Sequence, residues 1–198
     1  MIKIVAEMVN DEAVITADVG QHQMWVAQAY PFRRPRQWLT SGGLGTMGFG
    51  LPAAIGAALA EPKRTVICFT GDGSFLMNNQ ELATAAECAA NVKIFLLDNQ
   101  ALGLVHQQQH LFYEKRYNAC LFEHAIDFPA MARAFGVRAI DLAQTENPWN
   151  LIGQEINTRG PCLIHVPIDI DNRVFPMVPP GAANKDMIGD ETHAIATA

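Results

Sequence analysis

Two polar residues, Asp72 and Asn99, each lie two positions beyond an apolar run that is typical of a buried parallel strand. The first run, 65–70, continues as Gly71-Asp72-Gly73-Ser74, and the second, 92–97, continues as Asp98-Asn99-Gln100. The stretch 75–90 between them is compatible with a helix. Because ligands of open α/β sheets bind at the carboxyl ends of the strands, we expect Asp72 and Asn99 to meet at one site.

The residue types at these strand ends indicate the ligand. A carboxylate and an amide oxygen suit Mg2+, which prefers oxygen ligands and shares its coordination sphere with phosphate and water. Gly73 lets the backbone approach a ligand closely, and Ser74 can cap the following helix, whose N-terminus favours an anion. The pattern therefore predicts a diphosphate held through Mg2+. The plain alternative is a strand-turn-helix unit in which Asp72 is an ordinary cap.

A similar arrangement occurs near the start of the chain. The predicted strand 13–17 continues as Asp18-Val19-Gly20-Gln21-His22, and a helix is expected from there to about Tyr30. A strand end that feeds a helix N-terminus favours a second anion contact, to which His22 could donate a hydrogen bond. The alternative is that His22 is simply a polar residue at a helix start.

Composition limits the classes of function. The chain has 198 residues, enough for one domain, and 49% of them are hydrophobic. Its net charge is −6 and its densest basic cluster is 33–36, so we expect no nucleic-acid partner. The four cysteines form no CxxC, no apolar run reaches membrane-spanning length, and the first residues do not open a signal peptide. These features predict a cytoplasmic protein without structural zinc and without a membrane partner.

Strands and helices alternate along the whole chain, which predicts an α/β fold with a parallel sheet of five to six strands and helices on both faces. Residues 1–170 should form this domain, and residues 171–198, rich in proline and glycine, a C-terminal tail or lid. The further strands are expected at 38–40, 137–142 and 162–167, and the further helices at 1–10, 51–60, from Asp127-Phe128-Pro129 to Gly136, and from Asn147-Pro148 to Gly160.

Two other patterns leave alternatives open. Gly43, Gly45 and Gly48 form GxGxxG, so a nicotinamide-binding module is an alternative, with Asp72 as its acidic partner; the pattern otherwise marks a helix start packed tightly on the sheet. His106 and His110 share a helix face, but no third metal ligand is visible. We expect that helix to line the open side of the cofactor.

The pattern Gly71-Asp72-Gly73 followed by Asn99 resembles the cofactor motif of thiamine diphosphate (ThDP) enzymes, which usually ends in Asn-Asn where this chain has Asp98-Asn99. The segments 18–25, 41–58, 101–109 and 178–184 look like the large (catalytic) subunit of acetohydroxyacid (acetolactate) synthases, especially bacterial isozyme I. The resemblance covers nearly the whole chain and implies the ThDP-binding fold.

The resemblance also implies roles for individual residues. Mg2+ would be bound by the side chains of Asp72 and Asn99 and by the backbone carbonyl of Ala101. Met47 would hold the cofactor in its bent shape, backbone groups of Gly45 and Met47 would face the aminopyrimidine, and Leu104 would face the thiazolium ring and substrate. The diphosphate would lie against Val19, Gly20, Gln21, His22, Gly73 and Ser74.

The implied reaction decarboxylates pyruvate and joins the two-carbon unit to a second 2-oxo acid in branched-chain amino acid biosynthesis. The family's full subunit also has an FAD-binding domain and a pyrimidine-binding domain, and the latter supplies the activating glutamate. We therefore expect the isolated chain to be inactive or nearly so, and to work with a pyrimidine-binding domain or subunit, in a homo-oligomer, and with a regulatory small subunit. The alternatives are one half of a two-chain ThDP-dependent 2-oxo acid decarboxylase and an inert domain.

Overall fold

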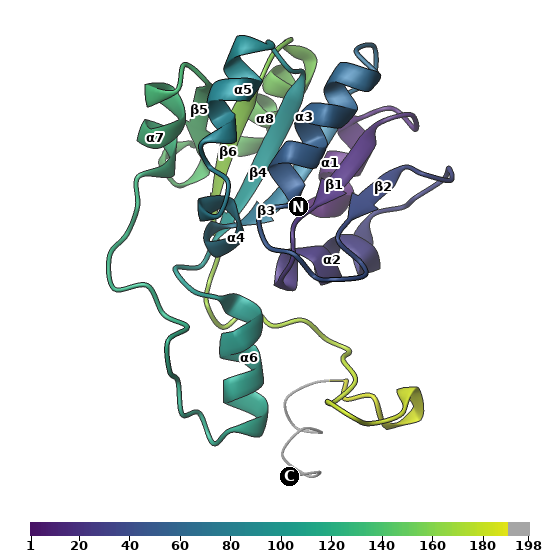
Figure 1. Cartoon of the computed structure of the whole chain (residues 1–198), viewed down its shortest axis with the longest axis vertical. Coiled ribbons are helices and arrows are strands. Elements are labelled where there is room, and N and C mark those ends of the chain that lie inside the picture. Colours follow the sequence, from purple (N-terminus) through teal and green to yellow (C-terminus); the bar gives the residue numbers. More distant parts are fainter. Residues whose placement is uncertain (190–198) are drawn as a thin grey trace.

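The computed structural model describes residues 1–189 and has at its centre a six-stranded sheet (Figure 1). All strand pairs are parallel, and the order is β2-β1-β3-β4-β6-β5. The predicted parallel sheet of five to six strands is confirmed. The strands are β1 (Val14–Ala17), β2 (Trp38–Thr40), β3 (Val66–Gly71), β4 (Val92–Asp98), β5 (Arg138–Asp141) and β6 (Cys162–Pro167).

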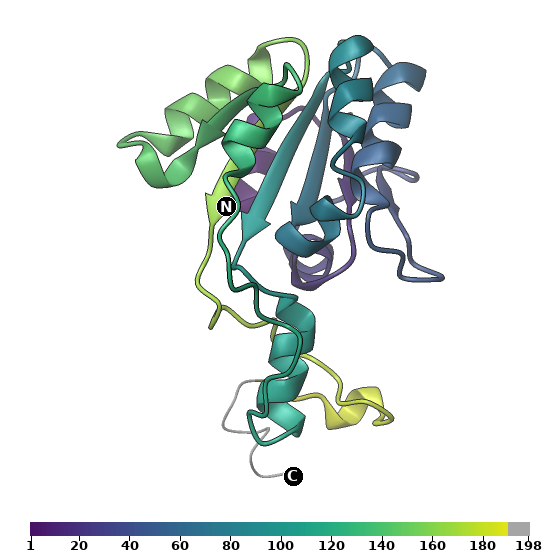
Figure 2. The same ribbon diagram turned by 60° about the vertical axis from the view of Figure 1, so that its left-hand side comes forward.

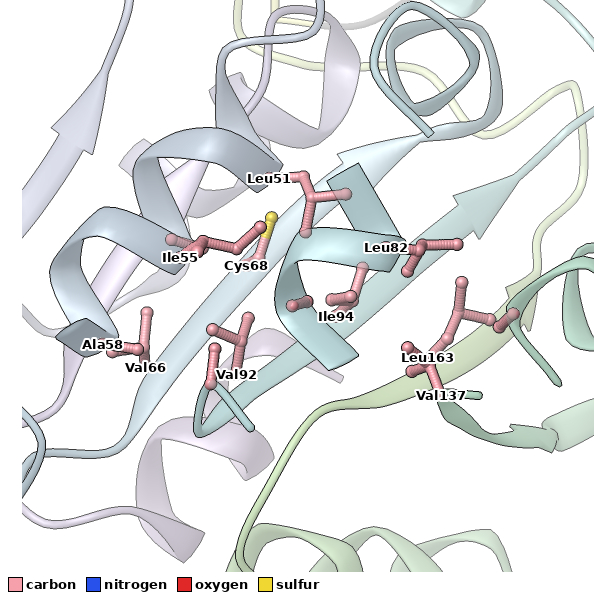
Figure 3. Close-up of a cluster of buried hydrophobic side chains, with 14 of the residues drawn as sticks. Leu51, Ile55, Ala58, Val66, Cys68, Leu82, Val92, Ile94, Val137 and Leu163 are labelled. Carbon is pink, nitrogen blue, oxygen red and sulfur yellow. The ribbon is translucent and has the colours of Figure 1, made fainter. Parts of the chain in front are cut away.

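Helices cover both faces of this sheet, as predicted. On one face α3 (Gly50–Ala60), α5 (Glu81–Glu87) and α7 (Phe128–Ala134) pack on strand side chains such as Val66 and Cys68 (Figure 3). On the other face α1 (Ile2–Met8), α2 (Gln21–Ala29) and α8 (Pro148–Asn157) pack on Ile67 and Phe69. Successive side chains of β3 thus enter different cores, and this explains why its sequence is a continuous apolar run.

The two helix starts predicted from Asp127 and Asn147 are confirmed. The Asp127 carboxylate accepts a hydrogen bond from the backbone N–H of Ala130 at 2.8 Å, and the Asn147 side chain accepts one from Asn150 at 3.3 Å. In both helices a proline lies in the first turn, where its missing N–H leaves no helical hydrogen bond unmade.

The single helix expected over 75–90 is wrong. The segment forms α4 (Asp72–Leu76) and α5, separated by residues 77–80. Asparagine side chains there bond to nearby backbone: Asn78 Nδ2 donates to the Gly48 carbonyl at 2.7 Å and Asn79 Nδ2 to the Leu76 carbonyl at 3.1 Å. Such bonds compete with helical hydrogen bonding and favour a break.

The predicted cap at Ser74 is also wrong. The helix begins at Asp72, and Gly71 is its N-cap residue, without a capping side chain. The Ser74 hydroxyl instead donates to the Val19 carbonyl at 2.8 Å. The serine therefore joins the segment after β3 to the segment after β1.

One helix, α6 (Gly103–Phe112), lies beyond the carboxyl ends of the strands, beside the loop 113–127 and the C-terminal segment (Figures 1 and 2). The C-terminal segment contains the 3-10 helix η2 (Asn184–Asp186) and a bridge between Met177 and Ile188; a second 3-10 turn, η1 (Leu142–Gln144), follows β5. The predicted tail extends to 198, and its last nine residues lie outside the described part of the chain.

No helix within residues 1–189 combines the length and the apolar character needed to cross a bilayer.

Candidate cofactor site

The sheet order creates a crevice between β1 and β3. After β1 the chain continues to β2 on one side, whereas β3, on the other side, leads to β4. Ligands of open α/β sheets bind where the connections diverge in this way. The segments that follow β1 and β3, residues 19–22 and 71–74, line one cavity there.

The cavity gathers nearly all the predicted site residues. Gly45 is the exception: it lies exposed in the loop 41–49, away from the cavity, whereas Met47 of the same loop lines it. The residues that line the cavity among those predicted are Val19, Gly20, Gln21, His22, Met47, Asp72, Gly73, Ser74, Asn99, Ala101 and Leu104.

The candidate metal ligands come together because β3 and β4 are neighbours. Their register pairs Gly71 with Leu97, so both chains leave the sheet at the same level. The buried Asp72 carboxylate accepts hydrogen bonds from the backbone N–H groups of Gly73 (2.7 Å) and Ala101 (3.1 Å). Asn99 Nδ2 donates to Gln21 Oε1 at 3.3 Å, which leaves Asn99 Oδ1 for another partner.

The electrostatics of the cavity fit a bound cation. Burial raises the pKa of Asp72 to about 7, and the nearby Asp98 carboxyl adds to the rise. Burial also lowers the pKa of His22 to about 3, so this imidazole is neutral at pH 7 and brings no charge. No Lys or Arg of the described chain lines the cavity. A diphosphate placed here therefore requires a metal ion, and the oxygen ligands present suit Mg2+.

Asp98, where the resembled family usually has asparagine, supports the turn that carries Asn99 and Ala101. Its Oδ1 accepts from the Gln100 N–H at 3.0 Å, and Gln100 has a left-handed φ of 54°. Its Oδ2 lies 3.0 Å from His165 Nε2. Burial disfavours the charged imidazole, but hydrogen bonds to Asp98 and Asp141 outweigh it and raise the pKa of His165. The carboxylate therefore holds the turn at one oxygen and is held in place at the other.

The glycine-rich loop has a different partner from the one that a dinucleotide site requires. The Asp18 carboxylate accepts from the N–H groups of Gly48 (2.9 Å) and Gly50 (3.1 Å), so a protein side chain satisfies the start of α3. Strand β1 also separates β2 from β3, and Asp72 is therefore not on the neighbouring strand. Gly48 has φ +85°, and a Cβ there would lie 2.8 Å from Met77 Cβ. The loop packs closely on the domain, as the alternative reading of these glycines predicts.

The histidine pair on α6 contacts an aromatic side chain. His106 stacks on Tyr117 with ring centroids 4.3 Å apart, and His110 Nδ1 lies 2.6 Å from the Tyr117 hydroxyl. Within residues 1–189, no three His, Cys, Asp or Glu side chains come together as a metal site. The pair thus helps to attach the loop 113–127 to α6.

Sequence reasoning missed several residues of the cavity. Most are apolar and carry no signal that separates them from core residues. Gly103 is different, because a Cβ there would collide with Gln21 Oε1 and Asn99 Nδ2; its sequence signals are its place at the start of a helix and within the segment 101–109 that carries the resemblance. The missed lining residues are Trp25, Gly71, Leu97, Leu102, Gly103, Val105 and Ile168.

Comparisons with known proteins agree with this geometry. Residues 18–166 match the family model described as "Thiamine pyrophosphate enzyme, C-terminal TPP binding domain". The chain is 60% identical over 190 residues to the acetolactate synthase isozyme 1 large subunit of Escherichia coli, and 46% identical over 188 residues to the isozyme 2 large subunit. It is 47% identical over 194 residues to the chloroplastic acetolactate synthase 2 of Nicotiana tabacum.

These alignments cover 96%, 95% and 94% of this chain but 34%, 34% and 29% of the relatives, so the chain spans about one third of their length. The match begins directly after β1 and ends within β6, so it includes every residue that lines the cavity except Ile168. The chain therefore belongs to the thiamine pyrophosphate enzyme family, as a C-terminal TPP binding domain.

Proposed function

We propose that the chain is the ThDP- and Mg2+-binding part of an acetolactate synthase large subunit. The whole enzyme would decarboxylate pyruvate and join the two-carbon unit to a second 2-oxo acid, in branched-chain amino acid biosynthesis. The observation that carries the proposal is the 60% identity to an isozyme 1 large subunit across 96% of the chain. The relatives favour neither the two-chain decarboxylase nor the nicotinamide module. The hydrogen bonds of Asp18 to the glycine-rich loop also disfavour the nicotinamide module.

In this proposal Mg2+ is bound by Asp72, Asn99 and the carbonyl of Ala101. Three features support it: the two side chains line one cavity, no Lys or Arg among residues 1–189 lines that cavity beside the buried Asp72, and the Asn99 oxygen is left for a cation. The ion would join the cofactor's diphosphate to the ends of β3 and β4.

The proposed contacts of the cofactor itself follow the same cavity. Its diphosphate would lie against the segment Val19–His22 and against Gly73 and Ser74, with Met47 and Leu104 nearer the rings. The backbone of Gly45 would contribute only if the loop 41–49 lies closer to the cavity than it does here. When bound, ThDP supplies the electron sink for decarboxylation, while the protein supplies position and electrostatics.

The remaining parts of the enzyme would come from outside this chain. We propose that a pyrimidine-binding domain supplies the activating glutamate, that FAD binds only in the full-length enzyme, and that the complete protein is a cytoplasmic homo-oligomer with a regulatory small subunit. The chain alone should then bind cofactor but make little or no acetolactate.

The test combines binding with activity. Calorimetry with ThDP and Mg2+ should give saturable binding, NADH should give none, and the acetolactate formed from pyruvate should stay near background until a pyrimidine-binding partner is added. Saturable NADH binding without ThDP binding would reverse the assignment. Turnover by the isolated chain at the rate of a complete synthase would contradict the proposed division of labour.

A further inference from the structure

Gln107 of α6 is fully buried and lies outside the cavity, yet it contacts the C-terminal segment with both ends of its side chain. The Val174 N–H donates to Gln107 Oε1 at 2.9 Å, and Gln107 Nε2 donates to the Val174 carbonyl at 2.8 Å. A backbone N–H can only donate and a carbonyl can only accept. The backbone of Val174 therefore fixes which end of the Gln107 amide is oxygen.

The same oxygen fixes the orientation of a second amide. Gln107 Oε1 also accepts from Gln21 Nε2 at 2.9 Å, and Gln21 Nε2 donates to the Asn172 carbonyl at 3.1 Å. Both partners require a donor, so the nitrogen of Gln21 must face them. The oxygen of the buried Gln21 side chain consequently points the other way, toward Asn99.

The third amide in this sequence is Asn99. Because Gln21 presents an oxygen, Asn99 turns its nitrogen toward it, at 3.3 Å, and its own oxygen remains for a cation. A flipped Asn99 would instead direct two N–H donors at the ion. The order of donors and acceptors from Val174 to Asn99 thus leaves one orientation in which every contact is satisfied.

We infer that Gln107 is a positioning residue that, through Gln21, determines which end of the Asn99 amide faces the metal. The inference rests on the proposed function, in which Asn99 Oδ1 binds Mg2+. It makes the backbone at 172–174, far from Asn99 in sequence, a determinant of metal affinity. Partners of ligand side chains commonly set metal affinity in this way.

The test measures Mg2+ affinity of the whole chain by calorimetry at saturating ThDP. Gln107→Met, which keeps the side-chain length but removes both polar ends, should weaken Mg2+ binding about tenfold. In an Asn99→Asp background the same substitution should cause no loss, because the two oxygens of a carboxylate are equivalent. Gln107→Glu, whose protonated carboxyl keeps an oxygen for Gln21 and the Val174 N–H and an O–H for the Val174 carbonyl, should restore most of the affinity.

The matched control is Gln28→Met. Gln28 Nε2 donates to the Pro176 carbonyl at 3.4 Å, so it contacts the same C-terminal segment without touching Gln21. This variant should bind Mg2+ as the unsubstituted chain does. Thermal unfolding would verify that each variant is folded, and Gln107→Leu replaces Gln107→Met if the latter is not.

The outcomes distinguish a failure of the inference about Gln107 from a failure of the proposed function. Equal weakening by Gln107→Met in both backgrounds would mean that Gln107 is merely structural and would overturn the inference alone. An unchanged Mg2+ affinity of Gln107→Met in the chain that retains Asn99 would overturn it as well. Absence of Mg2+ binding by the unsubstituted chain at any ThDP concentration would overturn the proposed function and the inference together.

Discussion

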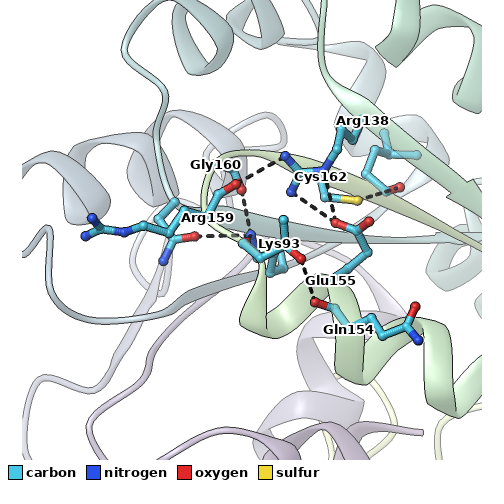
Figure 4. A network of polar contacts seen from close by, with 10 residues as sticks. Lys93, Arg138, Gln154, Glu155, Arg159, Gly160 and Cys162 are labelled. Atoms are coloured by element: carbon cyan, nitrogen blue, oxygen red, sulfur yellow. Dashed lines mark hydrogen bonds and ion pairs between the residues drawn. The ribbon is translucent and has the colours of Figure 1, made fainter.

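At the two ends of the same sheet, buried ionisable side chains differ in how fully the protein itself provides their partners. At the amino end of β4, the fully buried Lys93 donates to the carbonyls of Thr158 (2.6 Å) and Gly160 (2.5 Å) and to the Asn91 side chain (3.1 Å) (Figure 4). At the carboxyl end of β3, the buried Asp72 accepts from two backbone donors, the described residues place no Lys or Arg in its cavity, and burial raises its pKa to about 7.

This difference distinguishes a buried charge that stabilises the fold from one that belongs to a binding site. The ammonium of Lys93 has a partner for each of its three N–H groups, and the nearby Arg138 Nη2 lies 3.0 Å from Glu155 Oε2, so the amino end is complete within the chain. The carboxyl end also buries His22 Nε2 without a hydrogen-bond partner among the described residues. Buried groups left in this state indicate that something outside the chain completes the site.

The largest expected effect is at the incomplete end. Asp72→Asn removes the anionic ligand and should lower Mg2+ affinity at saturating ThDP about a hundredfold or more. Calorimetry measures this directly. Unchanged affinity in the folded variant would mean that the two ends do not differ as described.

The pH dependence of stability sharpens the same contrast. The pKa of Asp72 is higher in the folded state than its usual 3.8, so the folded state keeps a proton that the unfolded state loses. The stability from this group is complete below about pH 4 and is lost as pH rises to about 7.

Without Mg2+, the unfolding free energy of the unsubstituted chain should therefore fall by about 2–3 kcal/mol relative to that of Asp72→Asn over this range. Urea unfolding at several pH values measures the difference. Mg2+ with ThDP should offset the loss, since ligands that bind only the folded state stabilise it. Parallel pH profiles for the two proteins would contradict the account of Asp72.

At the amino end of the sheet, a substitution should change the stability of the chain and leave its Mg2+ affinity unchanged. Lys93→Met leaves buried carbonyl oxygens without donors and should lower the unfolding free energy by about 2 kcal/mol. Because Lys93 lies at the opposite end of the sheet, Mg2+ affinity should not change. A loss of Mg2+ affinity in a variant that remains folded would show that the two ends are coupled.

The smallest of these effects is expected when a methyl group is added at Gly103, beside the contact between Gln21 and Asn99. Gly103→Ala adds a Cβ that collides with Gln21 Oε1 and Asn99 Nδ2, and should weaken Mg2+ binding about tenfold. Gly56→Ala is the matched control, because a Cβ at Gly56 meets no atom within 4 Å. In the control, stability should rise by about 0.5–1 kcal/mol, as alanine favours a helix, and binding should be unchanged. Equal binding by both variants would show that the Gln21–Asn99 contact is dispensable.

Much of the fold could be predicted from the sequence because strands β1, β3, β4 and β6 are largely buried on both faces. Their continuous apolar runs, and the capping residues Asp127 and Asn147, mark elements whose local signals agree with the tertiary structure. The helix expected over 75–90 was wrong because its break depends on Asn78 bonding to Gly48, thirty residues earlier. That contact exists only once α3 is packed in place.

In the candidate site, too, some features follow from local sequence patterns and others depend on contacts between distant parts of the chain. The proximity of Asp72 to the turn after β4 followed from two adjacent strand ends, which local patterns reveal. The Gln21–Gln107 contact joins side chains 86 residues apart, and a buried glutamine within a helix carries no sequence signal for such a bond. Gly45 was placed by resemblance alone, and in the structure it lies away from the cavity.

The most direct test is calorimetry of ThDP binding with and without Mg2+, on the unsubstituted chain, Asp72→Asn and Lys93→Met. We expect saturable, Mg2+-dependent binding that Asp72→Asn weakens about a hundredfold or more and Lys93→Met preserves. ThDP binding that needs no divalent ion, or that is equally tight in Asp72→Asn, would contradict the account.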